Sequence, residues 1–354
     1  MKNDIDQLLK ATIESKASDL HITVGLPPMI RIDGELHPLW DIAPYTQDET
    51  KQLATAMVND SQRKALEETG QVDFSYSWSG YGRFRVNAFK QRTSYTVALR
   101  VIGSGIPTMA ELNLPKTMEQ LTRINKGLIL VTGPTGSGKS TTLASMIDII
   151  NSERSAHILT LEDPIEYLHR HKKSMVNQRE IGQDTTSYQD ALRAALREDP
   201  DVILVGEMRD LDSIAIALTA AETGHLVLST LHTIGAAKTI DRVIDVFPPH
   251  QQQQVRTQMA SVIQSVVSQQ LLAKKSGHGR IVALEIMIAN PAIRNLIREG
   301  KNHQINSILQ MSGKAGMVTM DSYLYDLYSK GVISMDNALF YSVDQEAMRK
   351  RMMV

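Results

Sequence analysis

One stretch, residues 127–141, constrains the fold more than any other part of the chain. It reads GLILVTGPTGSGKST and begins with a short apolar run that predicts a buried strand. The part from Gly133 to Ser140 matches the phosphate-loop pattern G-x-x-x-x-G-K-[ST] at every fixed position. Apolar residues then recur at helical spacing from Leu143 to Ile150. Strand, glycine loop and helix in this order predict a nucleoside triphosphate site.

The residues of this loop have separate predicted roles. Glycines let the backbone curl so that its N–H groups point at phosphate oxygens, and the helix N-terminus favours an anion. Lys139 is expected to reach the β- and γ-phosphates of ATP, and the Ser140 hydroxyl is expected to ligate Mg²⁺. The predicted nucleotide-binding residues are Gly133, Pro134, Thr135, Gly136, Ser137, Gly138, Lys139, Ser140 and Thr141. The alternative is a glycine-rich turn with an unrelated lysine, which the flanking strand and helix disfavour.

The composition limits the other classes of function. The 354 residues carry a formal net charge of -1, so no overall basic field attracts nucleic acid or an anionic membrane. The chain has no cysteine, which excludes disulfides and cysteine-ligated zinc. No apolar run is long enough to span a bilayer, and the N-terminus lacks an apolar signal core. We therefore expect a cytoplasmic protein whose membrane role, if any, comes through a partner.

Changes in hydrophobic periodicity predict two domains. Residues 1–102 combine short alternating strands with helices, which predicts a small α+β domain with a polar helical segment over about 46–68. Residues 103–116 are expected to form a linker. Residues 117–354 alternate strands and helices, the pattern of an α/β domain with a mostly parallel sheet. In this second domain we expect a long helix after Pro249 with buried positions as far as Leu271.

Two arginines of the first domain are candidate site residues. Arg85 and Arg100 lie on strand faces opposite the apolar residues, so both point away from the predicted core. From the residues alone, two interpretations stay open. The arginines either belong to a solvated sheet face or reach a phosphate across a domain or subunit boundary.

Acidic residues follow two predicted strands of the second domain. Glu162 and Asp163 come directly after residues 157–161, at the strand end where ligands bind in such sheets. Glu162 is a candidate for polarising the attacking water, and Asp163 for the magnesium shell, with a turn or cap role as the alternative. Glu207 follows residues 202–205 as a Walker B acid would, although the usual aspartate position is Gly206. Glu207 is therefore expected to act on Mg²⁺, through a water if not directly.

A histidine and a short helix of the second domain are further candidate features. His232 follows the strand at 226–229 on the ligand side, where it could contact the γ-phosphate or be structural. Residues 290–300 read as a compact helix with an N-cap at Asn290, and its arginines Arg294 and Arg298 share one face. Physical patterning alone does not separate this helix from an ordinary surface helix.

Together these stretches resemble the secretion ATPase superfamily, and most closely its type IV pilus retraction ATPases. The resemblance covers nearly the whole chain. Its marks are residues 17–21 (ASDLH), 82–87 (GRFRVN), the phosphate loop, 161–166 (LEDPIE), 206–210 (GEMRD), 229–233 (STLHT) and 292–299 (AIRNLIRE). The last of these looks like the motif specific to retraction ATPases, and a glycine at position 206 is normal for the family.

The resemblance implies a RecA-like ATPase domain behind a PAS-like N-terminal domain, assembled as a homohexameric ring. It implies that Glu162 is the general base, that Glu207 is the Walker B acid and that His232 contacts the nucleotide. It also implies that Arg85 and Arg100 reach the phosphates as the domains close. ATP and Mg²⁺ are the implied cofactors.

The implied function is ATP hydrolysis that powers pilus retraction and twitching motility at the inner face of the cell membrane. The implied partners are an inner-membrane pilus platform protein and, as a candidate, a second retraction ATPase. Two alternatives stay within the family: a pilus assembly or type II secretion ATPase, and an accessory retraction ATPase. A nucleic-acid translocase or a scaffold without turnover is less favoured, because aromatic content is 5% and the catalytic residues are intact. No nucleic-acid partner is expected.

Overall fold

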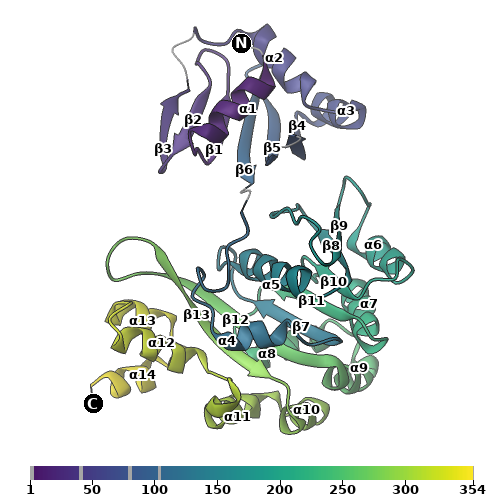
Figure 1. The fold of residues 1–354 in the computed structure, drawn as a ribbon, viewed down its shortest axis with the longest axis vertical. Helices are drawn as coiled ribbons and strands as arrows, with labels where there is room; N and C mark the ends of the chain where they lie inside the picture. The colour runs from purple at the N-terminus through teal and green to yellow at the C-terminus, as the bar shows by residue number, and fades with distance from the viewer. Residues whose placement is uncertain (1–3, 40–42, 79–81, 103–104, 354) are drawn as a thin grey trace. The chain divides into compact units, whose positions relative to one another are not determined.

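The computed structural model describes residues 4–39, 43–78, 82–102 and 105–353. The chain divides into two compact units, Met1–Gly105 and Ile106–Val354 (Figure 1). Residues 106–116, predicted as a linker, fall in the second unit, where Met109 is buried in a core with Met118 and Ile147. The sequence Gly80-Tyr81-Gly82 also predicts a turn, of which only Gly82 belongs to the described residues. Within the described ranges, every helix is too short or too polar to cross a membrane.

The first unit is an antiparallel sheet covered by helices. Its helices are α1 (Ile5–Glu14), α2 (Gln47–Ala56) and α3 (Asp60–Thr69), and its strands are β1 (Asp19–Ile22), β2 (Met29–Ile32), β3 (Glu35–Pro38), β4 (Gln71–Trp78), β5 (Gly82–Gln91) and β6 (Ser94–Ile102). The strand order is β3-β2-β1-β6-β5-β4. The helical segment expected over 46–68 is two helices, because Asn59 caps the second in a capping box with Gln62.

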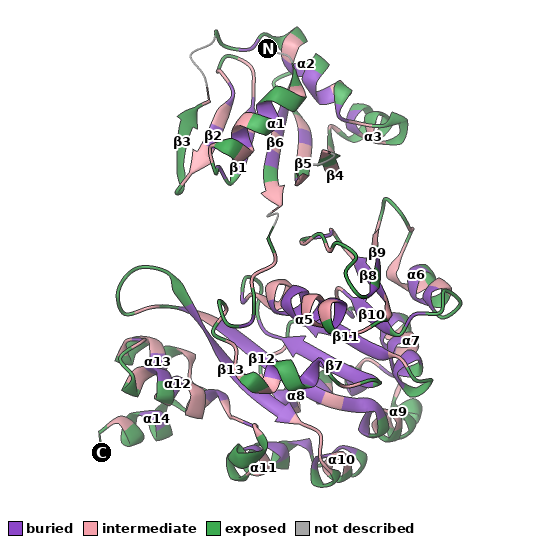
Figure 2. Cartoon of the chain, in the orientation of Figure 1, coloured by how far each residue is buried: buried purple, intermediate pink, exposed green. Residues whose placement is uncertain are grey.

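The second unit is a mostly parallel sheet with helices on both faces. Its strands are β7 (Gly127–Thr132), β8 (His157–Glu162), β9 (Met175–Glu180), β10 (Val202–Val205), β11 (Leu226–Leu231), β12 (Ile263–Ala273) and β13 (Arg280–Ile288), in the order β13-β12-β7-β11-β10-β8-β9. Only the β12–β13 pair is antiparallel among the pairs of this sheet. Figure 2 shows its central strands buried. The predicted α/β class with a parallel sheet is confirmed.

Helices of the second unit cover the sheet on both sides. They are α4 (Lys116–Leu121), α5 (Lys139–Glu153), α6 (Tyr188–Ala195), α7 (Leu211–Glu222), α8 (Ala236–Asp245), α9 (Pro249–Val262), α10 (Pro291–Arg298), α11 (Ile305–Met311), α12 (Met320–Ser329), α13 (Met335–Tyr341) and α14 (Gln345–Met352). Alternate residues of β7 enter different cores: Leu128 and Leu130 pack with α7 and α9, whereas Ile129 and Val131 pack with α4 and α5.

The long helix expected from Pro249 to Leu271 is wrong. Helix α9 ends at Val262, and the chain continues as strand β12, which pairs with β7 on one side and β13 on the other. Val266 and Val267 are both fully buried, on opposite faces of the sheet. A strand that is buried on both faces has apolar residues at successive positions. Some of these positions also match the spacing of a buried helix face, so the pattern does not separate the two structures.

Arg294 gives helix α10 a specific attachment that the sequence did not show. Its guanidinium donates hydrogen bonds to the carbonyl oxygens of Ala260 (2.6 Å) and Ser261 (3.0 Å) and to Gln264 Oε1 (3.2 Å). The first two carbonyls belong to the last turn of α9, where they have no partner within the helix. Arg294 therefore caps α9 from the neighbouring helix.

We expect Arg294→Ala to lower the free energy of unfolding by about 1 to 2 kcal/mol, because the last-turn carbonyls of α9 lose a charged donor. Chemical denaturation followed by circular dichroism measures this change. Arg298→Ala, at an exposed position of the same helix, is the matched control and should change stability by less than about 0.5 kcal/mol. Equal losses in both variants would contradict the capping role.

Candidate functional site

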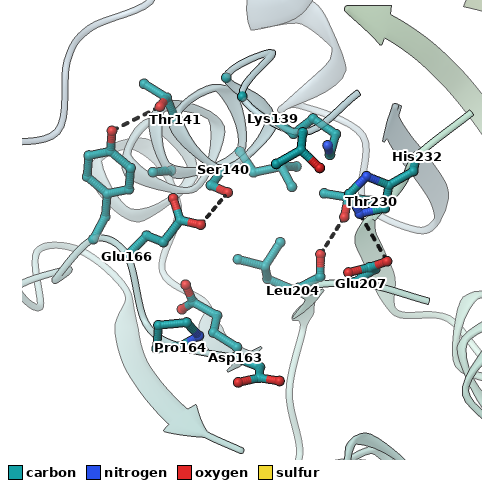
Figure 3. A pocket seen from close by; sticks show the side chains of 18 of the residues that line it. Lys139, Ser140, Thr141, Asp163, Pro164, Glu166, Leu204, Glu207, Thr230 and His232 are labelled. Atoms are coloured by element: carbon teal, nitrogen blue, oxygen red, sulfur yellow. Dashed lines mark hydrogen bonds and ion pairs between the residues drawn. The ribbon is translucent and has the colours of Figure 1, made fainter. Parts of the chain in front are cut away.

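The predicted phosphate loop borders a cavity of about 490 Å³ in the second unit. The cavity lies at the carboxyl edge of the parallel strands, where the loops that follow β7, β8, β10 and β11 come together. Its lining includes Thr135, Gly136, Gly138, Lys139, Ser140, Thr141, Glu162, Asp163, Glu166, Tyr188, Gly206, Glu207, Arg209, Thr230 and His232. The structure therefore brings most of the predicted nucleotide-domain residues to one place, shown in Figure 3.

The phosphate loop is curled around its own lysine. Lys139 Nζ donates to the carbonyl oxygens of Gly133 (2.8 Å) and Pro134 (3.0 Å). Burial lowers the pKa of Lys139, while Glu207 and Glu166 oppose that shift. The ammonium is thus held within reach of the cavity, where an anion would be a stronger partner than two neutral carbonyls.

The hydroxyl groups that follow the lysine contact residues after β8. Ser140 Oγ donates to Glu166 Oε1 at 3.0 Å, and Thr141 Oγ1 lies 2.9 Å from Tyr167 Oη (Figure 3). Ser140 is the predicted magnesium ligand, so this bond brings a carboxylate directly to that position. Glu166 has no role in the sequence-based prediction, although it lies in the same acidic segment as Glu162.

Glu162 occupies the end of β8 as a largely buried carboxylate. Its Oε1 accepts hydrogen bonds from Thr160 Oγ1 (2.7 Å) and Gln178 Nε2 (3.1 Å). Burial raises the pKa of Glu162, and these two hydrogen bonds only partly oppose it. A carboxylate with a raised pKa at the mouth of a phosphate site suits a general base, since it takes up a proton more readily than an exposed glutamate.

Glu207 connects the loops after β10 and β11. Its Oε1 lies 3.1 Å from His232 Nε2, and its Oε2 lies 2.8 Å from Arg209 Nε. Figure 3 shows His232 and Glu207 linked beside Thr230. The predicted Walker B acid and the predicted phosphate-contacting histidine therefore form one unit, with Arg209 as a member that the sequence did not indicate.

A glycine precedes Glu207 because the space for a side chain is already filled. A Cβ at Gly206 would lie 2.9 Å from Tyr188 Oη and 3.1 Å from the Leu161 carbonyl oxygen. These distances are shorter than ordinary van der Waals contact, so an aspartate does not fit here without rearrangement. This packing explains why the acid of this motif stands one position later than usual.

The oxygen-bearing side chains that line the cavity near Ser140 suit Mg²⁺ held mainly by phosphate oxygens and waters. A serine hydroxyl and the carboxylates of Asp163, Glu166 and Glu207 are ligands of the type Mg²⁺ prefers. Among the residues that the structure describes, however, no three acidic, histidine or cysteine side chains cluster closely enough to hold a metal ion by themselves. Mg²⁺ usually keeps waters and uses phosphate oxygens with only one or two protein ligands, and this site fits that mode.

The two predicted arginines belong to the first unit. Arg85 and Arg100 are directly opposite each other on β5 and β6, and Asp19 on β1 is the next residue in the same row. Arg100 Nε pairs with Asp19 Oδ1 at 2.9 Å. Burial would raise the pKa of Asp19, but hydrogen bonds from Ser18 and Arg100 outweigh it and hold that pKa low. On the other side of Asp19, Arg31 of β2 stands in the same row, with its Nε 4.0 Å from Asp19 Oδ2. Arg85 is exposed, so one acid serves a row that carries three cations.

Sequence reasoning missed residues that support the candidate catalytic groups. Gln178 donates a hydrogen bond to Glu162 from β9, a strand that the sequence did not predict. Arg209 pairs with Glu207, and no local sequence pattern indicates that contact. Tyr188 fills the space beside Gly206, and burial raises its pKa. Most of these contacts join segments that are far apart in the chain. Local sequence patterns could therefore identify Glu162 and Glu207 but not the residues that support them.

Comparisons with known proteins agree on one family. The family model described as type II/IV secretion system protein matches residues 1–338. The chain is 52% identical over 335 residues to the Pseudomonas aeruginosa "Type IV pilus retractation ATPase PilT", covering 95% of this chain and 97% of that protein. It is 49% identical to a Neisseria gonorrhoeae "Twitching motility protein", covering 91% and 86%. A crystal structure of the pilus retraction motor PilT with bound ADP superposes with a TM-score of 0.91 at 52% identity, covering 98% and 99%.

Proposed function

Because this chain belongs to the type II/IV secretion system protein family, we propose that it is the ATPase motor of type IV pilus retraction and twitching motility. Its reaction is the hydrolysis of ATP to ADP and phosphate. One observation carries the proposal: the lysine-bearing phosphate loop, the partly buried Glu162 and the Glu207–His232 pair meet in one cavity. Relatives that match almost end to end carry the names of retraction and twitching proteins, which favours retraction over assembly.

The residues that line the cavity are the ones we propose for phosphoryl transfer to water. Backbone N–H groups of the loop and Lys139 bind the phosphates, and Ser140 and Glu207 are the proposed protein contacts of Mg²⁺, which would neutralise charge on the phosphate oxygens. Glu162 orients the attacking water and accepts its proton. His232, held by Glu207, is placed to contact the γ-phosphate end. These assignments follow the sequence-based predictions and remain proposals.

We further propose a homohexameric ring in which Arg85 and Arg100 reach the phosphates as domains close. Like charges opposite each other on neighbouring strands are unfavourable, and an anion between them would reverse the sign of that interaction. A triphosphate is such an anion, and arginines brought to it by domain closure supply charge that the phosphate loop lacks. Closure around ATP and opening around ADP would convert hydrolysis into movement.

The motor is proposed to work at the inner face of the cell membrane, against an inner-membrane pilus platform protein. What supports this placement is the family membership, because the matching family is described as type II/IV secretion system proteins. A second retraction ATPase is a candidate partner. An assembly or secretion ATPase remains the alternative function.

Deletion of the gene in a piliated host, complemented with Glu207→Ala, tests the proposed function. Loss of the acid that holds His232 should stop hydrolysis, so surface pili persist or accumulate while twitching motility is lost. Electron microscopy and a surface-motility assay measure these outcomes. Complementation with Glu68→Ala, at an exposed position of α3, is the control and should restore motility. A strain that loses its pili would point to assembly instead.

A further inference from the structure

Gln269 lies where the central sheet meets the phosphate loop. It belongs to β12, whose register pairs the preceding residue, Ser268, with Thr132 at the end of β7. Gln269 therefore stands beside Gly133, the first residue of the loop, and its exposed fraction is 2%. A Cβ on Gly133 would overlap the carbonyl oxygen of Gln269. The loop thus begins in direct backbone contact with this residue.

The side-chain amide of Gln269 joins the loop to the helix that follows it. Its Nε2 donates to the carbonyl oxygen of Ser137 at 2.5 Å, and its Oε1 accepts from Thr142 Oγ1 at 2.9 Å. Ser137 and Thr142 are also buried, with exposed fractions of 2% and 1%. Both ends of one buried amide are therefore used to fix the middle of the loop against the first turn of α5.

This contact has a consequence for the N–H groups that bind phosphate. A trans peptide is planar, so its C=O and the following N–H point in opposite directions. Holding the Ser137 carbonyl toward Gln269 turns the N–H of Gly138 to the other side, and Gly138 lines the cavity. Inward-pointing N–H groups are what an anion-binding loop requires.

We propose that Gln269 is a positioning residue that holds the phosphate loop in its anion-binding form before nucleotide arrives. The inference rests on the proposed ATPase function and deepens it. Without the amide, the Ser137 carbonyl and the Thr142 hydroxyl lose their partners in a buried place, and binding would have to order the loop. ATP and ADP both use the loop, so both affinities depend on Gln269, whereas Glu162 and Glu207 at the reacting end do not contact it.

Gln269→Leu tests the proposal with purified full-length protein. We expect the Kd for ADP, measured by calorimetric titration, and the KM for ATP to rise about tenfold, the effect of leaving buried polar groups unpaired. The kcat should stay within about twofold of the wild-type value. The substitution weakens binding of the ground state and of the transition state equally, so the barrier between them is unchanged. A residue that only supported folding would lower the melting temperature without this split.

The chain provides matched controls. Gln270 is the next residue of β12, is also buried, and donates instead to the Tyr341 carbonyl oxygen. Gln270→Leu should lower the melting temperature and leave the Kd for ADP unchanged. Thr142→Val removes the other hydrogen bond and should weaken ADP binding by a smaller factor, whereas Thr142→Ser keeps the hydroxyl and should bind as wild type does. If Gln269→Leu does not fold, the comparison of Thr142→Val with Thr142→Ser tests the proposal instead.

Two results would overturn the inference. One is wild-type nucleotide affinity in folded Gln269→Leu or, where that variant does not fold, in Thr142→Val. The other is an equal loss of ADP affinity in Gln270→Leu, which would show that the effect comes from disturbing β12 as a whole. Wild-type protein that neither binds nor hydrolyses ATP would instead refute the proposed function, so the two failures are distinguishable.

Discussion

Glu162→Gln is expected to lower the kcat for ATP hydrolysis by about 10²- to 10⁴-fold while ADP still binds, because the amide cannot accept a proton from water. The substitution keeps the shape of the side chain and an oxygen that can accept from Thr160 and Gln178. The phosphate loop, which follows a different strand, β7, keeps all its residues. A phosphate-release assay together with ADP titration measures the two quantities separately.

The same variant should gain stability as it loses activity. Burial raises the pKa of Glu162, so ionising it costs folding free energy as pH rises above the usual glutamate value of 4.5. Glutamine removes that cost. Glu162→Gln should therefore melt at a higher temperature than the wild type at about pH 8, with the difference shrinking as pH falls toward 4.5.

Glu285→Gln is the matched control for a buried glutamate. Glu285 lies on β13, burial raises its pKa, and it accepts from the backbone N–H groups of Ala236 and Met320 rather than lining the cavity. Its glutamine variant should retain hydrolysis. Unchanged kcat in Glu162→Gln, or an equal loss in both variants, would contradict the assignment of Glu162 as general base.

Local patterns were sufficient for the elements that build the phosphate site. Strand β7, the glycine loop and helix α5 follow each other without interruption. Glu162 ends strand β8 and Glu207 stands two residues after β10, and the apolar runs of both strands are easy to recognise. Parallel pairing then requires their carboxyl ends to meet at one edge. Sequence reasoning could therefore place these side chains together without knowing any distance.

The support around those side chains could not be predicted in the same way. Residues 263–271 were expected to be helical because an apolar run in a strand buried on both faces also fits helical spacing. That error concealed Gln269, which touches the loop only because β12 pairs with β7. The link from Arg294 to the end of α9 likewise depends on packing between segments about thirty residues apart.

Lys139→Ala is expected to reduce kcat/KM for ATP by at least about 10²- to 10³-fold, since it removes the preorganised cation aimed at the transferring phosphoryl group. The ammonium now donates to the carbonyl oxygens of Gly133 and Pro134. ATP must draw it from these neutral acceptors to charged phosphate oxygens, a stronger hydrogen bond. Steady-state kinetics with an ATP titration measures the change.

Lys126→Ala is the control that separates this role from a general effect of losing a lysine. Lys126 lies just before the opposite end of β7, is exposed, and its backbone carbonyl, which the substitution keeps, accepts from Gln264. That variant should hydrolyse ATP at the wild-type rate. Lys139→Ala should stay folded, because the hydrogen bonds it loses lie within the loop and the loop is also held by Gln269 through Ser137. Near-normal turnover by folded Lys139→Ala would mean that the loop does not grip the triphosphate, and the motor function proposed here would fail with it.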